Sequence, residues 1–271
     1  MKKIISVILI LTLALGMFAA CGKTQPAAED NSLTAIQENG VLILGLDDSF
    51  PPMGFRDDNG QIVGFDIDVA TAVCEILGVE LQTQPIDWST KEVELNAGNI
   101  DCIWNGMSWN QERSESMSLS MPYLPNELAL VVMNDSGINS MADLQGKTLA
   151  VQSGSSAEEI INSEDGAALA GIVGNVVTFG DYLVALLDLE SGASDAVLID
   201  SVLANYLIAQ NGKQMKVLKD YLYEETYVIG FRKSDVALTD AVNAALSELK
   251  SNGTLGEIAT EWFGSDITIV E

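Results

Sequence analysis

Short apolar segments typical of β-strands alternate with longer segments of helical periodicity along most of this chain. Such alternation predicts a parallel-type sheet with helices packed on its faces, which defines an α/β fold. The first set comprises a strand over Val41–Leu46, a helix over Asp66–Leu77, a strand over Glu80–Ile86, a helix over Lys91–Ala97 and a strand over Asp101–Asn105.

A second set of the same kind follows a connecting strand over Leu128–Met133. It comprises strands over Thr148–Val151, Asn175–Thr178 and Ala196–Ile199, with helices over Ser156–Ser163, Tyr182–Glu190 and Ser201–Gln210. A strand over Glu225–Arg232 and closing helices over Leu238–Ser251 and Leu255–Trp262 complete the chain. We therefore expect two lobes with two crossings, residues 33–130 with 226–271 in lobe 1 and 131–225 in lobe 2. Ligands of open α/β sheets bind beyond the carboxyl ends of the strands, so the lobes should enclose a cleft there.

The N-terminus has the pattern of a secretory signal. Two lysines precede an apolar run over Ile4–Phe18 that is too short for a permanent membrane span. Ala19 and Ala20 then precede Cys21, which resembles a lipoprotein signal in which residues 1–20 are removed and Cys21 carries lipid. The alternative is an ordinary signal peptide with a coincidental cysteine. The polar tract at 21–32 should be a flexible tether that holds the protein at the outer face of the membrane.

The charge and the missing histidines exclude several classes of function. A formal net charge of −26 argues against nucleic acid as a partner. The chain has no histidine, which removes histidine-based catalytic triads and histidine-ligated metals. Neither a cofactor nor a metal is expected. Cys74 and Cys102 fall in a helical and a strand pattern, so both are expected in the core, and whether they form a disulfide stays open.

The segment from Asn105 to Arg113 follows a predicted strand and leads into a short helix. Asn110 is the expected N-cap, which puts Arg113 at the third helical position. A cation there opposes the helix dipole unless an anion lies nearby, and a planar guanidinium can hold a carboxylate by two parallel hydrogen bonds. Gly106, Met107 and Ser108 lie in the same segment and could add close backbone approach and a hydroxyl. The alternative for Arg113 is a solvated surface side chain.

Three further segments follow strands and carry polar or aromatic groups. Ser153, Ser155 and Ser156 surround a glycine turn before a helix, a pattern that suits an anion or a plain helix cap by Ser156. The turn lacks the lysine of a phosphate loop. Asp200 ends a buried-type strand and could cap the next helix, accept an ammonium group, or do both.

The loop after the first strand contains Asp47 and Phe50, and its prolines leave Phe50 without regular structure. Phe50 and Trp88, which follows another strand, could supply two walls of a ligand site.

The order and spacing of these segments, over nearly the whole mature chain, resemble the bacterial extracellular solute-binding proteins of family 3, which serve polar amino acid ABC transporters. The motifs that carry the resemblance are Gly64-Phe65-Asp66-Ile67-Asp68-Val69-Ala70, Gly106 to Arg113 leading into Ser120-Met121-Pro122-Tyr123, Asp143-Leu144-Gln145-Gly146-Lys147 before Gly154-Ser155-Ser156, and Asp195-Ala196-Val197 leading to Asp200. Ser108 and Asn110 stand where threonine is commoner in the family.

The resemblance implies a two-lobed fold of the periplasmic-binding-protein type II and a free amino acid as ligand. It assigns the α-carboxylate to Arg113, Ser108 and Ser156, and the α-ammonium to Asp200. Phe50 and Trp88 would form an aromatic sandwich, and Asp47 would face a basic side chain. The lobes would close on the ligand, and a monomer would deliver it to the permease.

Two alternatives come from other classes of protein. A cleft enzyme of the same superfamily, similar to the dehydratases that act on cyclic acids, would use Asp47, Glu158 or Asp200 as acid or base. A sensory binding module would adjoin a membrane span and a signalling domain. The acidic balance and Asp47 favour arginine or lysine as ligand, with glutamine and cystine as close candidates.

Overall fold

The computed structural model describes residues 30–211 and 214–271. The expected signal peptide and the lipidation site Cys21 therefore lie outside the described residues. The expected tether ends at Ser32, which is the first residue of helix α2 (Ser32–Asn39). Within the described ranges, none of the helices combines the length and the apolar character needed to cross a membrane.

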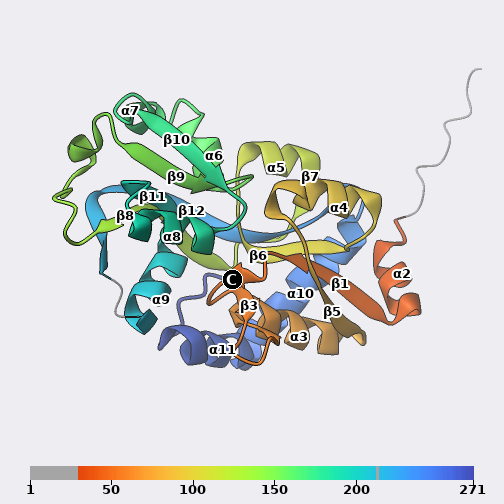
Figure 1. Ribbon diagram of the computed structural model, residues 1–271. Coiled ribbons are helices and arrows are strands. Elements are labelled where there is room, and N and C mark those ends of the chain that lie inside the picture. Colours follow the sequence, from red (N-terminus) through yellow and green to blue (C-terminus); the bar gives the residue numbers. More distant parts are fainter. Residues whose placement is uncertain (1–29, 212–213) are drawn as a thin grey trace, which may run out of the picture. The chain divides into compact units, whose positions relative to one another are not determined.

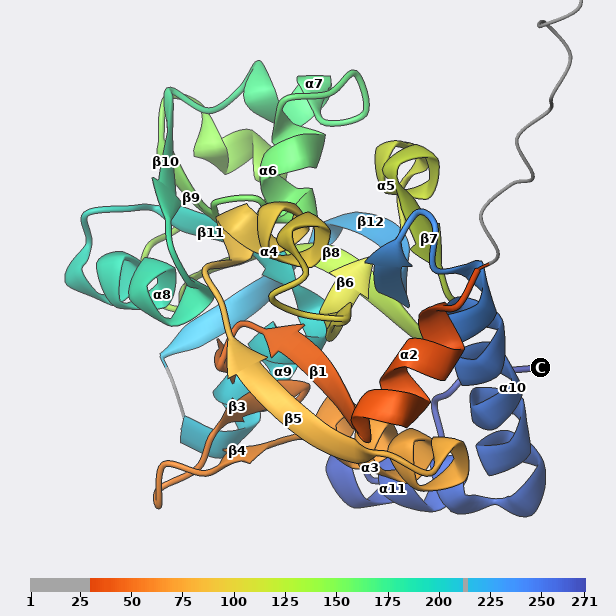
Figure 2. The ribbon, with the colours of Figure 1, turned by 90° about the vertical axis from the view of Figure 1, so that its right-hand side faces the viewer.

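Lobe 1 is built on three parallel-paired strands, β1 (Val41–Leu46), β5 (Glu80–Pro85) and β6 (Cys102–Ser108). Its other elements are α2, α3 (Phe65–Leu77), the 3₁₀ turn η1 (Trp88–Thr90), α4 (Lys91–Ala97), α5 (Gln111–Ser116), β7 (Met117–Leu119), α10 (Val236–Asn252) and α11 (Thr254–Phe263). Helices α2, α3, α10 and α11 pack together beside β1 and β5, as Figure 2 shows, while α4 packs against β1 and β6.

Lobe 2 repeats the pattern with β9 (Thr148–Gln152), β10 (Asn175–Phe179) and β11 (Ala196–Asp200) in parallel. Its helical elements are η2 (Met141–Leu144), α6 (Ser156–Ile161), α7 (Ala167–Ala170), α8 (Tyr182–Ser191) and α9 (Ser201–Asn211). Helix α8 packs against β9, β10 and β11, and α6 also contacts β9 and β11 (Figure 1).

Two long strands, β8 (Leu124–Met133) and β12 (Met215–Arg232), join the lobes as an antiparallel pair. β8 pairs with β11 of lobe 2, and the end of β12 pairs with β6 of lobe 1. The result is one continuous sheet with the order β10-β9-β11-β8-β12-β6-β1-β5. The expected lobe boundaries, at residues 130/131 and 225/226, fall inside these two strands.

The apolar core follows this layout. One cluster covers the same face of the sheet in both lobes, from Leu44 and Val73 to Leu186 and Leu203. Two smaller clusters fill the opposite face, one in each lobe. Cys74 and Cys102 are buried in the shared core as free thiols, as expected for core residues.

The structure corrects three expectations. The sheet is mixed, because β8 and β12 pair antiparallel with their neighbours while each lobe's own strands are parallel. β12 begins at Met215, ten residues before the expected strand start at Glu225. Phe50 lies in a small three-stranded sheet formed by β2 (Ser49–Phe50), β3 (Gly54–Arg56) and β4 (Ile62–Val63), whereas we expected it in an irregular loop.

Candidate functional site

A hollow with an empty volume of about 290 Å³ lies where elements of the two lobes face one another. The residues that line it are Asp47, Phe50, Trp88, Asn105, Gly106, Ser108, Arg113, Gln152, Ser155, Ser156, Tyr182 and Asp200. We call this hollow the interlobe cavity.

Arg113 is a fully enclosed cation in the wall of the interlobe cavity. Asn110 caps α5 by accepting from the Arg113 N–H at 2.7 Å, which confirms the expected start of this helix and fixes the arginine at its third position. The guanidinium Nη1 donates to the Ser108 carbonyl at 2.6 Å, and the residue is 2% exposed. Its buried Nε has no hydrogen-bond partner in the protein. Because a buried donor without a partner costs about 1–3 kcal/mol, this nitrogen is suited to an anionic group that enters the cavity.

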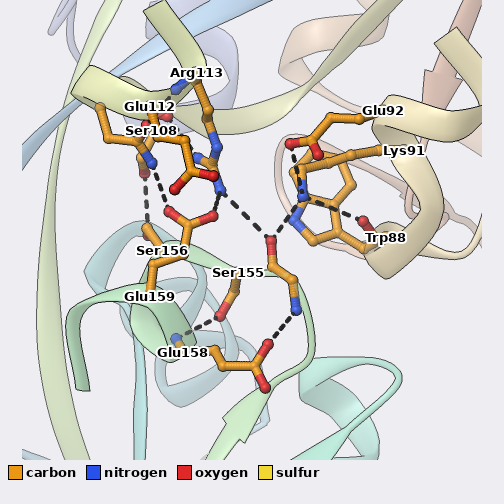
Figure 3. A network of polar contacts seen from close by, with 12 residues as sticks. Trp88, Lys91, Glu92, Ser108, Glu112, Arg113, Ser155, Ser156, Glu158 and Glu159 are labelled. Carbon is orange, nitrogen blue, oxygen red and sulfur yellow. Dashed lines mark hydrogen bonds and ion pairs between the residues drawn. The ribbon is translucent and has the colours of Figure 1, made fainter. Parts of the chain in front are cut away.

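Polar contacts link the two lobes beside the cavity, and Figure 3 shows several of them. Arg113 Nη2 donates to Glu159 at 2.7 Å, and Asn110 donates to the same carboxylate. Lys91 of lobe 1 donates through Nζ to the Gly154 carbonyl of lobe 2 at 2.8 Å. A Cβ atom added at Gly154 would lie 2.8 Å from the Ser89 Cα, so only glycine permits this approach of the lobes. The structure is therefore the closed form.

Asp200 contributes a buried carboxylate from the end of β11. Its Oδ1 accepts from the Tyr227 hydroxyl at 2.8 Å and from Asn126 Nδ2 at 2.7 Å. Burial raises the pKa of Asp200 to about 7, and the neighbouring Glu225 carboxylate adds to the rise. A cation that enters the cavity would favour the ionised form of Asp200.

A second carboxylate and three aromatic rings complete the wall. Asp47 accepts from Gln152 Nε2 of lobe 2 at 2.6 Å, and burial raises the pKa of Asp47. Phe50 and Tyr182 lie with ring centroids 6.0 Å apart at an interplanar angle of 46°. Trp88 is 6% exposed and belongs to the opposite lobe from Tyr182. The cavity wall thus combines apolar ring surfaces with positively and negatively charged side chains.

The backbone around Gly106 is fixed from behind the cavity. The Gly106 N–H donates to Asp66 Oδ2 at 2.8 Å, and Asp66 is fully buried. Gly106 has φ of +58°, and a Cβ there would lie 2.8 Å from the Phe50 ring. A side chain at this position would therefore push Phe50 out of the wall. The amide of Asn105, oriented with its oxygen toward the Gly54 N–H, donates to the Asp47 carbonyl at 2.9 Å.

Ten of the twelve ligand-site residues expected from the sequence line the interlobe cavity, and two do not. Met107 is fully buried in the lobe 1 cluster that contains Ile103 and Val228. Ser153 lies outside the wall, where its N–H donates to the Phe179 carbonyl. The N-cap of α6 is Ser155, which corrects the assignment to Ser156, and Ser156 instead lines the cavity with its hydroxyl donating to the Ser108 hydroxyl.

Gln152 and Tyr182 line the cavity and were not among the expected residues. Gln152 is the last residue of an otherwise apolar strand and is 1% exposed. A buried polar side chain at a strand end was the signal that could have identified it. Tyr182 begins α8, where an aromatic residue is indistinguishable from a core position by pattern alone.

The chain passes twice between two α/β lobes, and the lobes close over a polar cavity. This architecture is that of a two-lobed binding protein. The family profile described as bacterial extracellular solute-binding proteins, family 3, matches residues 42–265. The chain belongs to this family, and its fold is the type II arrangement of periplasmic binding proteins.

Relatives of the chain include binding proteins for several amino acids. The L-cystine-binding protein TcyJ of Escherichia coli (strain K12) is 29% identical over 243 residues, 89% of this chain and 89% of TcyJ. The arginine-binding extracellular protein ArtP of Bacillus subtilis (strain 168) is 31% identical over 94% of this chain and 97% of ArtP. A substrate-binding protein of an ABC uptake transporter from Streptococcus pneumoniae, solved with bound histidine, has a TM-score of 0.86 at 39% identity, over 89% of this chain and 99% of that chain.

Proposed function

We propose that this chain is the substrate-binding component of an ABC importer, which captures a free amino acid in the interlobe cavity and presents it to the permease. The observation that carries the proposal is the closed cavity itself, which is lined by a buried guanidinium from lobe 1 and a buried carboxylate from lobe 2. An amino acid carries an α-carboxylate and an α-ammonium group on one carbon, and their charges are complementary to those of these two side chains. The relatives for cystine, arginine and glutamine support this ligand class.

The proposed mechanism is lobe closure about β8 and β12, with residues 33–130 and 226–271 moving as one lobe and 131–225 as the other. Arg113, Ser108 and Ser156 would receive the α-carboxylate, and Asp200 the α-ammonium. A ligand that touches both lobes favours the closed form, because only there are both half-sites filled. The permease would then bind the closed shape of a monomer.

Binding without chemistry is the proposed role, in place of a dehydratase-like cleft enzyme or a sensory module. The relatives named above are binding proteins. Recovery of the ligand unchanged after long incubation with the protein tests this role, and a new product would contradict it.

A thermal-shift screen of the purified protein against all common amino acids tests the function. At a ligand concentration 100 times the Kd, binding stabilises the folded form by about 2.7 kcal/mol. We expect at least one amino acid to raise the Tm by several degrees. If no amino acid raises it, the proposed ligand class is wrong.

Asp47 is the proposed selector for a cationic side chain. It is 7% exposed, and it lines the interlobe cavity. We expect Asp47→Asn to lower the affinity for arginine and lysine about tenfold or more relative to glutamine, since a buried ion pair is lost. Titration calorimetry with the three ligands measures the ratio.

Asp48→Asn is the matched control for this change. Asp48 pairs with Arg56 at 2.6 Å and does not line the cavity. Its substitution therefore removes the same charge one residue away from Asp47. An equal loss of affinity for all three ligands in the Asp47 variant would rule out the selector role.

The anchor is proposed to be lipid on Cys21, after removal of residues 1–20. Several acyl chains on one residue bind a membrane with about 0.8 kcal/mol per buried CH₂ group. We expect the native protein to fractionate with membranes and Cys21→Ser to be released in soluble form. Membrane retention of Cys21→Ser, measured by immunoblot of both fractions, would exclude this anchor.

A further inference from the structure

Glu159 of α6 carries a carboxylate that reaches across to lobe 1 without lining the interlobe cavity. Its Oε1 accepts from Arg113 Nη2 at 2.7 Å, and its Oε2 accepts from Asn110 Nδ2. Arg113 belongs to α5, and Asn110 is the residue that caps this helix. One carboxylate of lobe 2 therefore holds two neighbouring donors of lobe 1.

The Arg113 guanidinium gains its negatively charged partner from the opposite lobe. A guanidinium has five N–H donors and no acceptor. Within lobe 1, Nη1 donates to the Ser108 carbonyl at 2.6 Å, whereas Nη2 donates to Glu159 and, at 3.5 Å, to the Gly154 carbonyl of lobe 2. In the described part of the chain, Glu159 is the carboxylate with which Arg113 forms an ion pair. Lobe closure therefore gives this buried cation its counter-charge.

The surroundings of this ion pair decide how much it contributes. An ion pair between two exposed side chains contributes little, because water and salt screen both charges. Here the Arg113 side chain is 3% exposed and the Glu159 side chain is 37% exposed. Removal of the carboxylate would leave a buried cation with less compensation. The contribution of Glu159 should therefore exceed that of a surface pair.

A second cation of lobe 1 increases the need for a carboxylate at this place (Figure 3). Lys91 Nζ donates to the Gly154 carbonyl at 2.8 Å, so Lys91 and Arg113 approach one oxygen. The pKa of Lys91 is lowered to about 8, mainly by burial and next by the charge of Arg113, while the Glu159 carboxylate acts in the opposite direction. Glu159 thus offsets part of the repulsion between two cations of the same lobe.

We propose that Glu159 is a positioning residue that orients the Arg113 guanidinium across the lobes and stabilises the closed form by the same amount for every ligand. The inference rests on the proposed function and goes beyond it, because Glu159 contacts Arg113 and does not line the cavity. With Nη1 and Nη2 held by protein oxygens, Nε is left for the ligand. Since the contact forms only on closure, its effect should appear in the dissociation rate and not in selectivity.

Stopped-flow kinetics and titration calorimetry of Glu159→Gln, with the two amino acids that bind best in the thermal-shift screen, test the proposal. We expect the variant to bind both about tenfold more weakly, with the loss in the dissociation rate and the association rate nearly unchanged. The ratio of the two affinities should stay that of the unmodified protein. Glu159→Asp, which keeps the charge on a shorter side chain, should recover part of the loss. An unchanged dissociation rate, or a loss confined to one of the two ligands, would overturn the proposal.

A double-mutant cycle with Asn110→Ser separates the cross-lobe contact from a general loss of stability. A serine can still cap α5, because its hydroxyl accepts from the Arg113 N–H, but it lacks the amide donor that binds Glu159. Asn110→Ser alone should raise the dissociation rate severalfold, and it should add little when Glu159 is already glutamine. Additive losses would show that the two residues act independently, and the inference would be wrong.

Single-molecule FRET between dyes on exposed sites of the two lobes gives a readout that needs no ligand. The dwell time of the closed form should be several times shorter in Glu159→Gln, both without ligand and at saturating ligand. Glu164→Gln is the matched control, because Glu164 is an exposed acid of the same lobe that does not line the cavity, and it should keep the dwell time of the unmodified protein. Equal dwell times in the two variants would overturn the role of Glu159, whereas absence of amino acid binding by the unmodified protein would overturn the proposed function.

Discussion

Replacement of Arg113 by alanine is expected to lower the affinity for the amino acid ligand by at least about 100-fold, because a buried, hydrogen-bonded charge contact is worth about 2–5 kcal/mol. The change removes the unpartnered Nε and also the cross-lobe bond to Glu159. Arg113→Lys should recover only part of the affinity, since lysine keeps the charge and loses the planar pair of donors. Titration calorimetry measures both losses.

Arg56→Ala is the control for this prediction. Arg56 forms a surface pair with Asp48, its side chain is 49% exposed, and such pairs contribute little to stability. Its replacement should leave ligand affinity unchanged. If Arg113→Ala binds the amino acid as tightly as the unmodified protein while keeping a cooperative unfolding transition, Arg113 has no part in the site.

Asp200→Asn is expected to lower affinity about 100-fold at pH 8 and to remove a pH dependence that the unmodified protein should show. In the closed structure, with no ligand in the cavity, the pKa of Asp200 is about 7, raised by burial and by Glu225 of β12. The other titratable groups that face it are Tyr227 of β12 and Tyr182 of α8. A bound ammonium lowers this pKa, so binding below pH 7 must release a proton, and affinity should fall toward tenfold per pH unit as pH decreases.

Proton release on binding is measured by calorimetry at pH 6.5 in buffers of different ionisation enthalpy. We expect up to one proton released by the unmodified protein and none by Asp200→Asn. Asn126 and the Tyr227 hydroxyl can still hydrogen-bond an asparagine side chain, so the fold should survive the change. Constant affinity of the unmodified protein from pH 5 to pH 8 would exclude Asp200 as the ammonium acceptor.

The sequence predicts most helices and strands of the two lobes well, because each of these elements has a clear periodicity of apolar residues. The expected bounds of the strand at Val41–Leu46 and the helix at Lys91–Ala97 agree with the structure. The first half of β12 was missed because lysines at 216 and 219 and a register shift between Val217 and residue 222 interrupt its apolar alternation. The strands β2 to β4 have two or three residues each, too few to show a period.

The site was partly predictable for a physical reason. Ligands of α/β sheets bind beyond the carboxyl ends of the strands, which makes Asp47, Ser108 and Asp200 candidates from the sequence. Glu225, which accepts a hydrogen bond from the Ser108 hydroxyl, could not be identified in this way, because it lies within a strand. The contact exists only once β12 runs beside β6, and local sequence contains no sign of that pairing.

A crystal structure of the protein with its tightest amino acid ligand tests the central claim most directly. We expect the ligand inside the interlobe cavity, with its carboxylate oxygens at about 2.7–2.9 Å from the Arg113 guanidinium and its ammonium at a similar distance from Asp200. A ligand bound outside this cavity, or bound with its ammonium toward Arg113, would contradict the account.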